Sequence, residues 1–152
     1  MPIGSDTFAY RRHLPHLVNA DKTYFVTFRT IRRFQLEPTA RSAVLEACVE
    51  LHKVVCWLDC ITVMPDHIHM IFKPLDVAVS EVMKRLKGRS ARRVNLSIGR
   101  SGPLWQHESF DHILRSGESL HAKMEYVCNN PVRAGLAGRW QDYPWTWRAC
   151  DH

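Results

Sequence analysis

The sequence predicts an α+β fold, in which a ferredoxin-like split βαβ antiparallel sheet carries helices on one face and an added helix follows near the C-terminal end. The apolar pattern changes between a period of two and a period of about 3.6, in the order strand, helix, strand, strand, helix, strand, helix. The chain has 152 residues, of which 45% are hydrophobic and 24% charged, as in one globular domain. We therefore expect a single domain over residues 1–152.

The first strand and the first helix are predicted over residues 24–30 and 39–55. In the segment YFVTFRT, β-branched and aromatic residues alternate between two faces, as they do in a pleated strand. Pro38 then offers a helix start, and apolar side chains follow at the i, i+3, i+4, i+7 spacing of an amphipathic helix.

Residues 57–63 and 67–73 are predicted to form a β-hairpin. The Pro65-Asp66 pair between them suits the central positions of a type I turn. Along the second strand apolar residues alternate with His67 and His69, so the two histidines should project from the opposite face.

A second helix is predicted over residues 79–98, where apolar residues again recur with helical spacing and basic residues cover the other faces. The segment 101–103 (SGP) breaks it, and after irregular extended chain residues 110–115 are predicted as a fourth strand. The third helix is expected over residues 120–129. Pro131 should end it, because the residue before a proline is pushed out of the helical region.

The two ends of the chain have different predicted roles. Residues 1–22 are expected to be an N-terminal leader that precedes the folded core. Residues 140–152 form an aromatic tail, in which WQDYPWTW holds three of the five tryptophans. Packing against the core is the favoured interpretation of this tail, and stacking on nucleic-acid bases is the alternative.

Composition limits where the protein works. No window approaches the roughly 18 apolar residues of a membrane span, and the first residues lack the apolar core of a signal peptide. The five cysteines are an odd number and contain no C-x-x-C pair. A soluble, cytoplasmic protein with reduced thiols and no membrane partner is expected.

The net charge of +6 is concentrated in one segment, residues 84–100, which holds seven cations and no acid. A solvated helix face normally mixes both signs, whereas clustered cations are typical of proteins that bind a polyanion. The candidate contacts on this helix are Lys84, Lys87, Arg89, Arg92 and Arg93.

The motif MPDHIHMIF carries the sharpest local signal. Two histidines at i and i+2 of a strand project the same way and can hold one metal ion between their imidazoles. The alternative is a pair of surface or hydrogen-bonded histidines. The apolar opposite face favours the metal site, because it leaves both histidines on a polar face beside a tight turn.

Tyr126 supplies the second signal. With Leu120 as zero on a helical wheel, the apolar stripe lies between about −20° and 80°, whereas Tyr126 falls near 240° and Asn130 near 280°. Tyr126 is therefore either a solvated aromatic or a hydroxyl presented to a site. Asn130, one turn later on the same face, could add an amide oxygen to that site.

These residues resemble a known family, the REP-associated tyrosine transposases, a bacterial branch of the single-tyrosine HUH transposases. The resemblance covers nearly the whole chain, through RRHLPH, YFVTFRT, VMPDHIHMIF, LKGRSARRVN, GPLWQ, DHILRS, EYVCNNPVRAGL and DYPW in that order. The HUH box and the tyrosine helix are its specific parts.

The resemblance implies a metal-dependent single-stranded DNA endonuclease and strand transferase that acts at REP-type hairpins. His67 and His69 would be the metal ligands, Tyr126 the nucleophile on the catalytic helix, and Asn130 would stand at the position of a third ligand. The implied cofactor is Mg²⁺ or Mn²⁺, with no small-molecule cofactor, and a monomer is favoured over a homodimer. Attack by the phenol would give a 5′-phosphotyrosine link and a free 3′-hydroxyl, a reversible exchange of one phosphodiester for another.

Two other functions remain open at this point. A domesticated protein could keep the fold and the basic helix, bind DNA hairpins and no longer cleave them. A structural zinc site could instead use His67, His69 and a cysteine such as Cys60 on the neighbouring strand.

Overall fold

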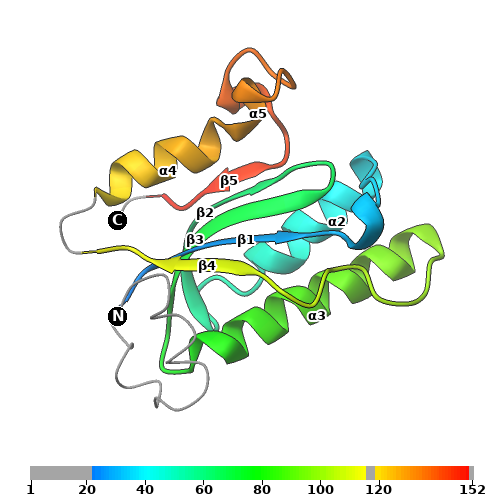
Figure 1. Ribbon diagram of the computed structural model, residues 1–152, viewed down its shortest axis with the longest axis horizontal. Helices are drawn as coiled ribbons and strands as arrows, with labels where there is room; N and C mark the ends of the chain where they lie inside the picture. The colour runs from blue at the N-terminus through cyan, green and yellow to red at the C-terminus, as the bar shows by residue number, and fades with distance from the viewer. Residues whose placement is uncertain (1–21, 116–118, 151–152) are drawn as a thin grey trace.

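A five-stranded antiparallel sheet forms the centre of the molecule in a computed structural model, which describes residues 22–115 and 119–150. Helices α2 (Pro38–Val49) and α3 (Val79–Ile98) cover one face, and α4 (Leu120–Cys128) lies across the other (Figure 1). The predicted leader, apart from Lys22, lies outside the described residues. The α+β class and the added C-terminal helix are confirmed.

The strand order in the sheet is β4-β1-β3-β2-β5, with every neighbouring pair antiparallel. The strands are β1 (Tyr24–Arg29), β2 (Cys56–Val63), β3 (His67–Pro74), β4 (Phe110–Ile113) and β5 (Thr146–Arg148). The first four match the predicted strands to within a few residues, and the tight turn between β2 and β3 is closed by the Met64 N–H donating to the His67 carbonyl (2.8 Å). β5 was not predicted, because its three residues lie in the aromatic tail and are too short for a period-two pattern.

The first predicted helix extends too far. α2 ends at Val49, and the predicted final turn is instead a tight loop in which Lys53 has a φ of 72°. In this loop His52 Nδ1 accepts a hydrogen bond from the Leu58 N–H (3.0 Å). Leu51 and Val55 still bury their side chains, which explains why they matched the helical pattern.

The third helix ends within one residue of the prediction, but not for the predicted reason. α4 ends at Cys128, Asn129 leaves the helical path with a ψ of 3°, and a short helix α5 (Asn130–Arg133) begins at once. Pro131 does not end a helix here. It lies in the first turn of α5, where a proline is tolerated because that turn needs no N–H donor.

Two hydrophobic clusters lie on the two faces of the sheet. The larger packs Phe28, Ile68 and Phe72 against α2 and α3. The smaller packs Phe25 and Ile71, from the opposite face, against α4. The alternation read from the sequence in β1 and β3 is therefore confirmed.

The aromatic tail packs against the core, as the favoured interpretation held. Trp145 and Trp147 lie against the larger cluster. Tyr143 is buried and its hydroxyl donates to the Val63 carbonyl at the end of β2 (2.6 Å).

The remaining short helices are η2 (Ile31–Arg33) and η3 (Trp140–Asp142). Within the described ranges, no helix is long and apolar enough to span a lipid bilayer.

Candidate active site

A row of polar side chains crosses the sheet on the face covered by α4. Thr27 of β1 and Thr62 of β2 lie in register on either side of His69, and Thr146 of β5 continues the row beside Thr62. On one side of this row the same face carries Phe25, Cys60 and Ile71, which belong to the smaller cluster. The row is therefore a polar strip that begins where the smaller cluster ends.

The polar row fixes the C-terminal part of α4. Thr62 Oγ1 donates to the Val127 carbonyl (3.0 Å), while Val127 and Cys128 bury their side chains in the smaller cluster. Tyr126 consequently turns away from the sheet, with 49% of its surface exposed. Tyr24 and Tyr143 are both buried.

One aromatic ring links Tyr126 to His69. The Phe25 ring stacks against the His69 imidazole, with 6.0 Å between centroids and 7° between planes. The Tyr126 ring meets the same Phe25 edge-on at 6.3 Å. Phe25 therefore sets the spacing of the phenol from the imidazole.

His67 and His69 lie side by side at the start of β3, with ring centroids 4.8 Å apart. The Nδ1 atom of His67 is hydrogen-bonded to Asp66 Oδ1 (2.7 Å), and that of His69 to Thr27 Oγ1 (2.8 Å). No hydrogen-bond partner of either Nε2 atom is found in the part of the chain that the structure describes. Metal-binding histidines show this pattern, in which one ring nitrogen is held by the protein and the other is left for the metal.

His69 is held in its neutral form. Burial, and then the charges of His67, Arg29 and Arg133, lower the pKa of His69 to about 3. A neutral imidazole is the form that binds a metal ion. The environment of His69 therefore suits a ligand better than a general acid.

Asp66 forms the polar support of His67. Burial acts to raise the pKa of Asp66, but the hydrogen bond from His67 and the charges of Arg33 and Arg29 outweigh burial, so the pKa is lowered. Arg33 reaches the same carboxylate, with Nη2 3.4 Å from Oδ2.

Asn130 begins α5, one residue after the break at Asn129. The prediction that Asn130 lies one turn beyond Tyr126 on the same helix was therefore wrong, because α4 ends before Asn130. The side-chain Nδ2 of Asn130 is buried and has no hydrogen-bond partner among the described residues. A half-turn about the Cβ–Cγ bond of Asn130 would bring the amide oxygen to this position, where it could accept a hydrogen bond or bind a cation. The two neighbouring imidazoles, whose Nε2 atoms are free, are a pair of donors that a divalent ion accepts.

A cavity of about 590 Å³ opens beside these residues. His69 and Tyr126 both line it, together with Arg29 and Gln106. The segment 108–110 forms a further wall. One cavity therefore receives the candidate nucleophile and one of the candidate ligands.

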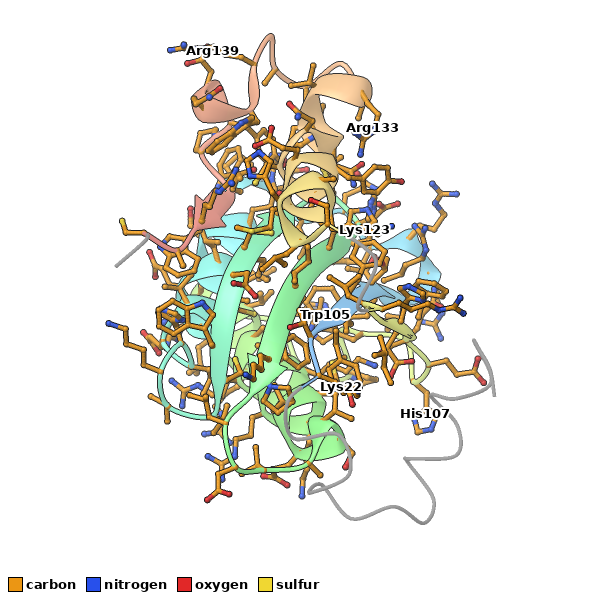
Figure 2. All side chains as sticks on the ribbon, turned by 90° about the vertical axis from the view of Figure 1, so that its left-hand side faces the viewer. Lys22, Trp105, His107, Lys123, Arg133 and Arg139 are labelled. Atoms are coloured by element: carbon orange, nitrogen blue, oxygen red, sulfur yellow. The ribbon has the colours of Figure 1, made fainter. Side chains whose placement is uncertain are left out.

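Two cationic side chains lie beside Tyr126 that the sequence analysis did not identify. The Arg133 guanidinium lies 4.0 Å from the centroid of the Tyr126 ring, and Arg133 Nη2 donates to the Tyr126 carbonyl (2.7 Å). Lys123 Nζ lies 5.8 Å from the same ring. Figure 2 shows Lys123 on α4 and Arg133 on α5 on the same side of the molecule. Arg133 lies in the motif EYVCNNPVRAGL, which was the signal available in the sequence.

The basic helix is not on the same face as this site. α3 packs with α2 beneath the sheet, on the far side from α4 (Figure 1). Arg89 and Arg93 donate to one carboxylate oxygen of Glu50, at 2.6 and 2.7 Å. Lys84 and Lys87 instead line a second cavity, of about 730 Å³.

The second cavity adjoins the first at the outer edge of the sheet. Both are lined by Glu108 and Ser109, just before β4. The lysine side of α3 is thus within reach of a ligand that leaves the Tyr126 cavity around β4. The structure brings His67, His69 and Tyr126 to one region and leaves the α3 cations beyond the sheet edge.

The zinc set of His67, His69 and Cys60 is not formed. Over residues 22–115 and 119–150, no group of three or more His, Cys, Asp or Glu side chains is placed to hold a metal ion. Cys60 lies instead in the smaller cluster with Cys128 and Ile71. After the bulge between Leu58 and Cys60, Cys60 pairs with Ile71, two residue pairs along the ladder from His69.

A comparison with protein families matches residues 18–130 to the model described as IS200-like transposase. The chain belongs to the IS200-like transposase family. An IS200-like transposase is a DNA-cleaving enzyme, so the expected enzyme class is confirmed. No curated protein sequence matches the chain.

Solved structures show the same fold. A REP-associated tyrosine transposase bound to a REP hairpin is similar with a TM-score of 0.67 and 22% identity, over 84% of this chain and 76% of that chain. This likeness agrees with the resemblance found in the sequence. A bacterial tRNA(His) guanylyltransferase-like protein in complex with GTP has a TM-score of 0.53 and 14% identity, over 91% of this chain and 76% of that one. The fold alone therefore does not separate transposases from other enzymes, whereas the family match does.

Proposed function

We propose that this IS200-like transposase cuts and rejoins single-stranded DNA at REP-type hairpins, through a covalent bond between Tyr126 and a 5′-phosphate. The observation that carries the proposal is that Tyr126 and His69 line one cavity and contact the same Phe25 ring. The REP-associated transposase of similar fold is bound to a REP hairpin, which supports this class of substrate.

In the proposed reaction Tyr126 Oη attacks the scissile phosphorus and the bond from phosphorus to the 3′-oxygen breaks. The phenol loses its proton, and the leaving 3′-oxygen takes one up to become a hydroxyl. One phosphodiester replaces another, so the reverse attack by a 3′-hydroxyl rejoins a strand without an external energy source. Phe25 and Arg133 keep the phenol ring in place for both directions.

His67, His69 and Asn130 are the residues that would hold a divalent ion, Mg²⁺ or Mn²⁺. When bound, the ion supplies positive charge that polarises the phosphate for attack by a phenol, which is otherwise a weak nucleophile near pH 7. Asp66 and Thr27 orient the two imidazoles, and burial keeps His69 neutral.

The protein acts as a monomer in this reaction. Tyr126 and His69 of one chain line the same cavity, so a second copy is not required to complete the site. The basic helix α3 would hold the hairpin backbone through its lysines and arginines, with the DNA passing the sheet edge at β4.

The test is Tyr126→Phe, which removes the hydroxyl and keeps the ring. A hairpin oligonucleotide with a 3′-end label is incubated with Mn²⁺ and separated on a denaturing gel. The natural protein should acquire a protease-sensitive labelled band, and Tyr126→Phe should lose it while it still binds the hairpin. Tyr143→Phe is the matched control, since its buried hydroxyl bonds to Val63 outside the cavity.

The same gel separates the alternatives. Persistence of the band in Tyr126→Phe would refute the single-tyrosine mechanism. Hairpin binding by the natural protein with no labelled band in Mg²⁺ or Mn²⁺ would identify a domesticated binding protein instead.

A further inference from the structure

We propose that Arg29 and Arg33 form a binding subsite for a single backbone phosphate, next to the phosphate that is cleaved. The inference rests on the proposed function, because it assumes that a DNA strand passes His67 and Tyr126. It adds to that function a second point of contact on the opposite side of the histidine pair from Tyr126.

The subsite is a cavity of about 390 Å³. Arg29, Thr30, Arg33, Asp66 and Gln106 line it. It shares Arg29 and Gln106 with the larger cavity that His69 and Tyr126 line. A strand that occupies both cavities would therefore pass Arg29 on its way from Tyr126 to Arg33.

The walls of this cavity are fixed by hydrogen bonds. Thr30 is buried, and its carbonyl accepts a hydrogen bond from Gln106 Nε2 (3.2 Å). The Thr30 N–H donates to the Asp66 carbonyl (3.0 Å). The Gln106 N–H in turn donates to the Arg29 carbonyl (2.8 Å). The backbone that carries Arg29 is therefore tied to the backbone that carries His67.

Arg33 is presented by an unusual turn. Arg32 and Arg33 follow β1 with φ values of 48° and 57°, a left-handed conformation that residues other than glycine rarely adopt. Such conformations persist where the surrounding structure requires them, and often at functional sites. Here the turn brings Arg33 to Asp66, the residue that holds His67.

Charge favours an anion in this cavity. Two guanidinium groups face one carboxylate, and the Asp66 carboxylate is already engaged by His67 and Arg33. Arg29 is exposed, lies close enough to His69 and Asp66 to act on both electrostatically, and has no ion pair or hydrogen bond from its guanidinium within the described residues. A free guanidinium beside a second, exposed one matches the fork geometry by which arginine binds phosphate oxygens.

The test measures binding without chemistry, in EDTA, by fluorescence anisotropy. Each phosphate near the cleavage position of a hairpin oligonucleotide is replaced in turn by an uncharged methylphosphonate. For the natural protein, one replacement within two nucleotides of the cleaved bond should weaken binding about tenfold, the loss of one charge-assisted contact.

Arg29→Gln and Arg33→Gln should each weaken binding of the unmodified oligonucleotide to a similar degree and reduce the salt slope by about 0.7. In each variant, neutralising that same phosphate should cost less affinity than it costs the natural protein, because one of the two guanidinium contacts is already lost. Arg33→Lys keeps the charge and loses the fork, so it should restore the salt slope and recover only part of the affinity. Arg32→Gln is the matched control, because Arg32 shares the strained turn and the charge but does not line the cavity, so it should behave as the natural protein.

Equal effects of Arg32→Gln and Arg33→Gln would overturn the subsite. So would a loss on neutralising the phosphate that is as large in Arg29→Gln and in Arg33→Gln as in the natural protein. If one of the two cavity variants fails to fold, the other and the phosphate scan on the natural protein decide. If a covalent Tyr126 adduct forms but the arginine variants and the phosphate replacement act independently on binding, the subsite alone is refuted. If their effects on binding depend on each other and no adduct forms, the subsite stands and the proposed cleavage is refuted.

Discussion

At the scale of single residues, Thr27 holds the Nδ1 atom of His69 and so decides which ring nitrogen a metal can reach. Thr27→Val removes the hydroxyl and nearly keeps the shape. Loss of such an outer contact typically weakens metal affinity by about 10- to 100-fold. We expect this weakening for Mn²⁺, measured by calorimetry on the protein without DNA and by the Mn²⁺ dependence of cleavage.

Thr27→Ser is the control for that change, because it restores the hydroxyl at the same position. It should bind Mn²⁺ nearly as the natural protein does. Unchanged Mn²⁺ affinity in Thr27→Val would show that the hydrogen bond to His69 does not support a metal ligand.

Asp59 provides a pH-dependent prediction away from the site. Burial raises the pKa of Asp59 to about 6, although the Trp57 N–H bonded to its Oδ1 (3.1 Å) and the Lys73 charge oppose the shift. The carboxyl of the unfolded chain keeps its ordinary pKa near 4, so between about pH 4 and pH 6 the folded protein binds the extra proton. Ionised Asp59 therefore lowers the free energy of unfolding as the pH rises through this interval.

Asp59→Asn should consequently stabilise the protein at pH 7.5 by about 1–2 kcal/mol, a figure that allows for the part of the carboxyl that water reaches. Asparagine keeps an oxygen to accept the Trp57 N–H. Urea unfolding at pH 7.5 and at pH 4 measures the effect, and the stabilisation should vanish at pH 4. A stabilisation of the same size at both pH values would mean that the charge is not its cause.

At the scale of elements, α3 carries its charge on two sides that have different partners. Lys84 and Lys87 line a cavity at the sheet edge, whereas Arg89 and Arg93 are paired with Glu50 at the end of α2. Exposed ion pairs of this kind are weak, so a phosphate backbone can compete for the arginines. The packing of α2 on α3 therefore sets how available these cations are to DNA.

Glu50→Gln should free both arginines. If Arg89 and Arg93 bind DNA as proposed, hairpin affinity rises and the salt slope becomes steeper by up to about 0.7–0.9 for each additional phosphate that the protein neutralises. Glu46→Gln is the control, since it removes the same charge one helical turn away, where only a 3.9 Å ion pair with Arg93 exists. Identical salt slopes for the two variants would remove the arginine side of α3 from the interface.

At the scale of the whole molecule, stability and the site are separate. The sheet is held by a cluster on each face, and Ile68, Met70 and Phe72 are fully buried beneath the two histidines. We therefore expect chelation by EDTA to stop cleavage and to leave hairpin binding and the thermal midpoint nearly unchanged. A fall of the midpoint by many degrees in calorimetry would indicate a structural metal instead.

Much of the fold followed from local patterns. The alternation in β1 and β3 depends only on residues two apart, and the hairpin turn needs only Pro65 and Asp66. The ends of helices were less accessible. Leu51 and Val55 fit a helical spacing because a tight loop buries them too, and β5 forms only because β2 offers it an open edge.

The sequence by itself determined the fold class, the shared face of His67 and His69 and the exposure of Tyr126, because each depends on a short-range period in the chain. The tertiary structure alone decided that Phe25 contacts both the phenol and the imidazole, that Arg133 packs on the Tyr126 ring, and that α3 lies on the far face of the sheet. These interactions join residues from separate elements. Their positions depend on how α4, α5 and the sheet pack together, which no local spacing encodes.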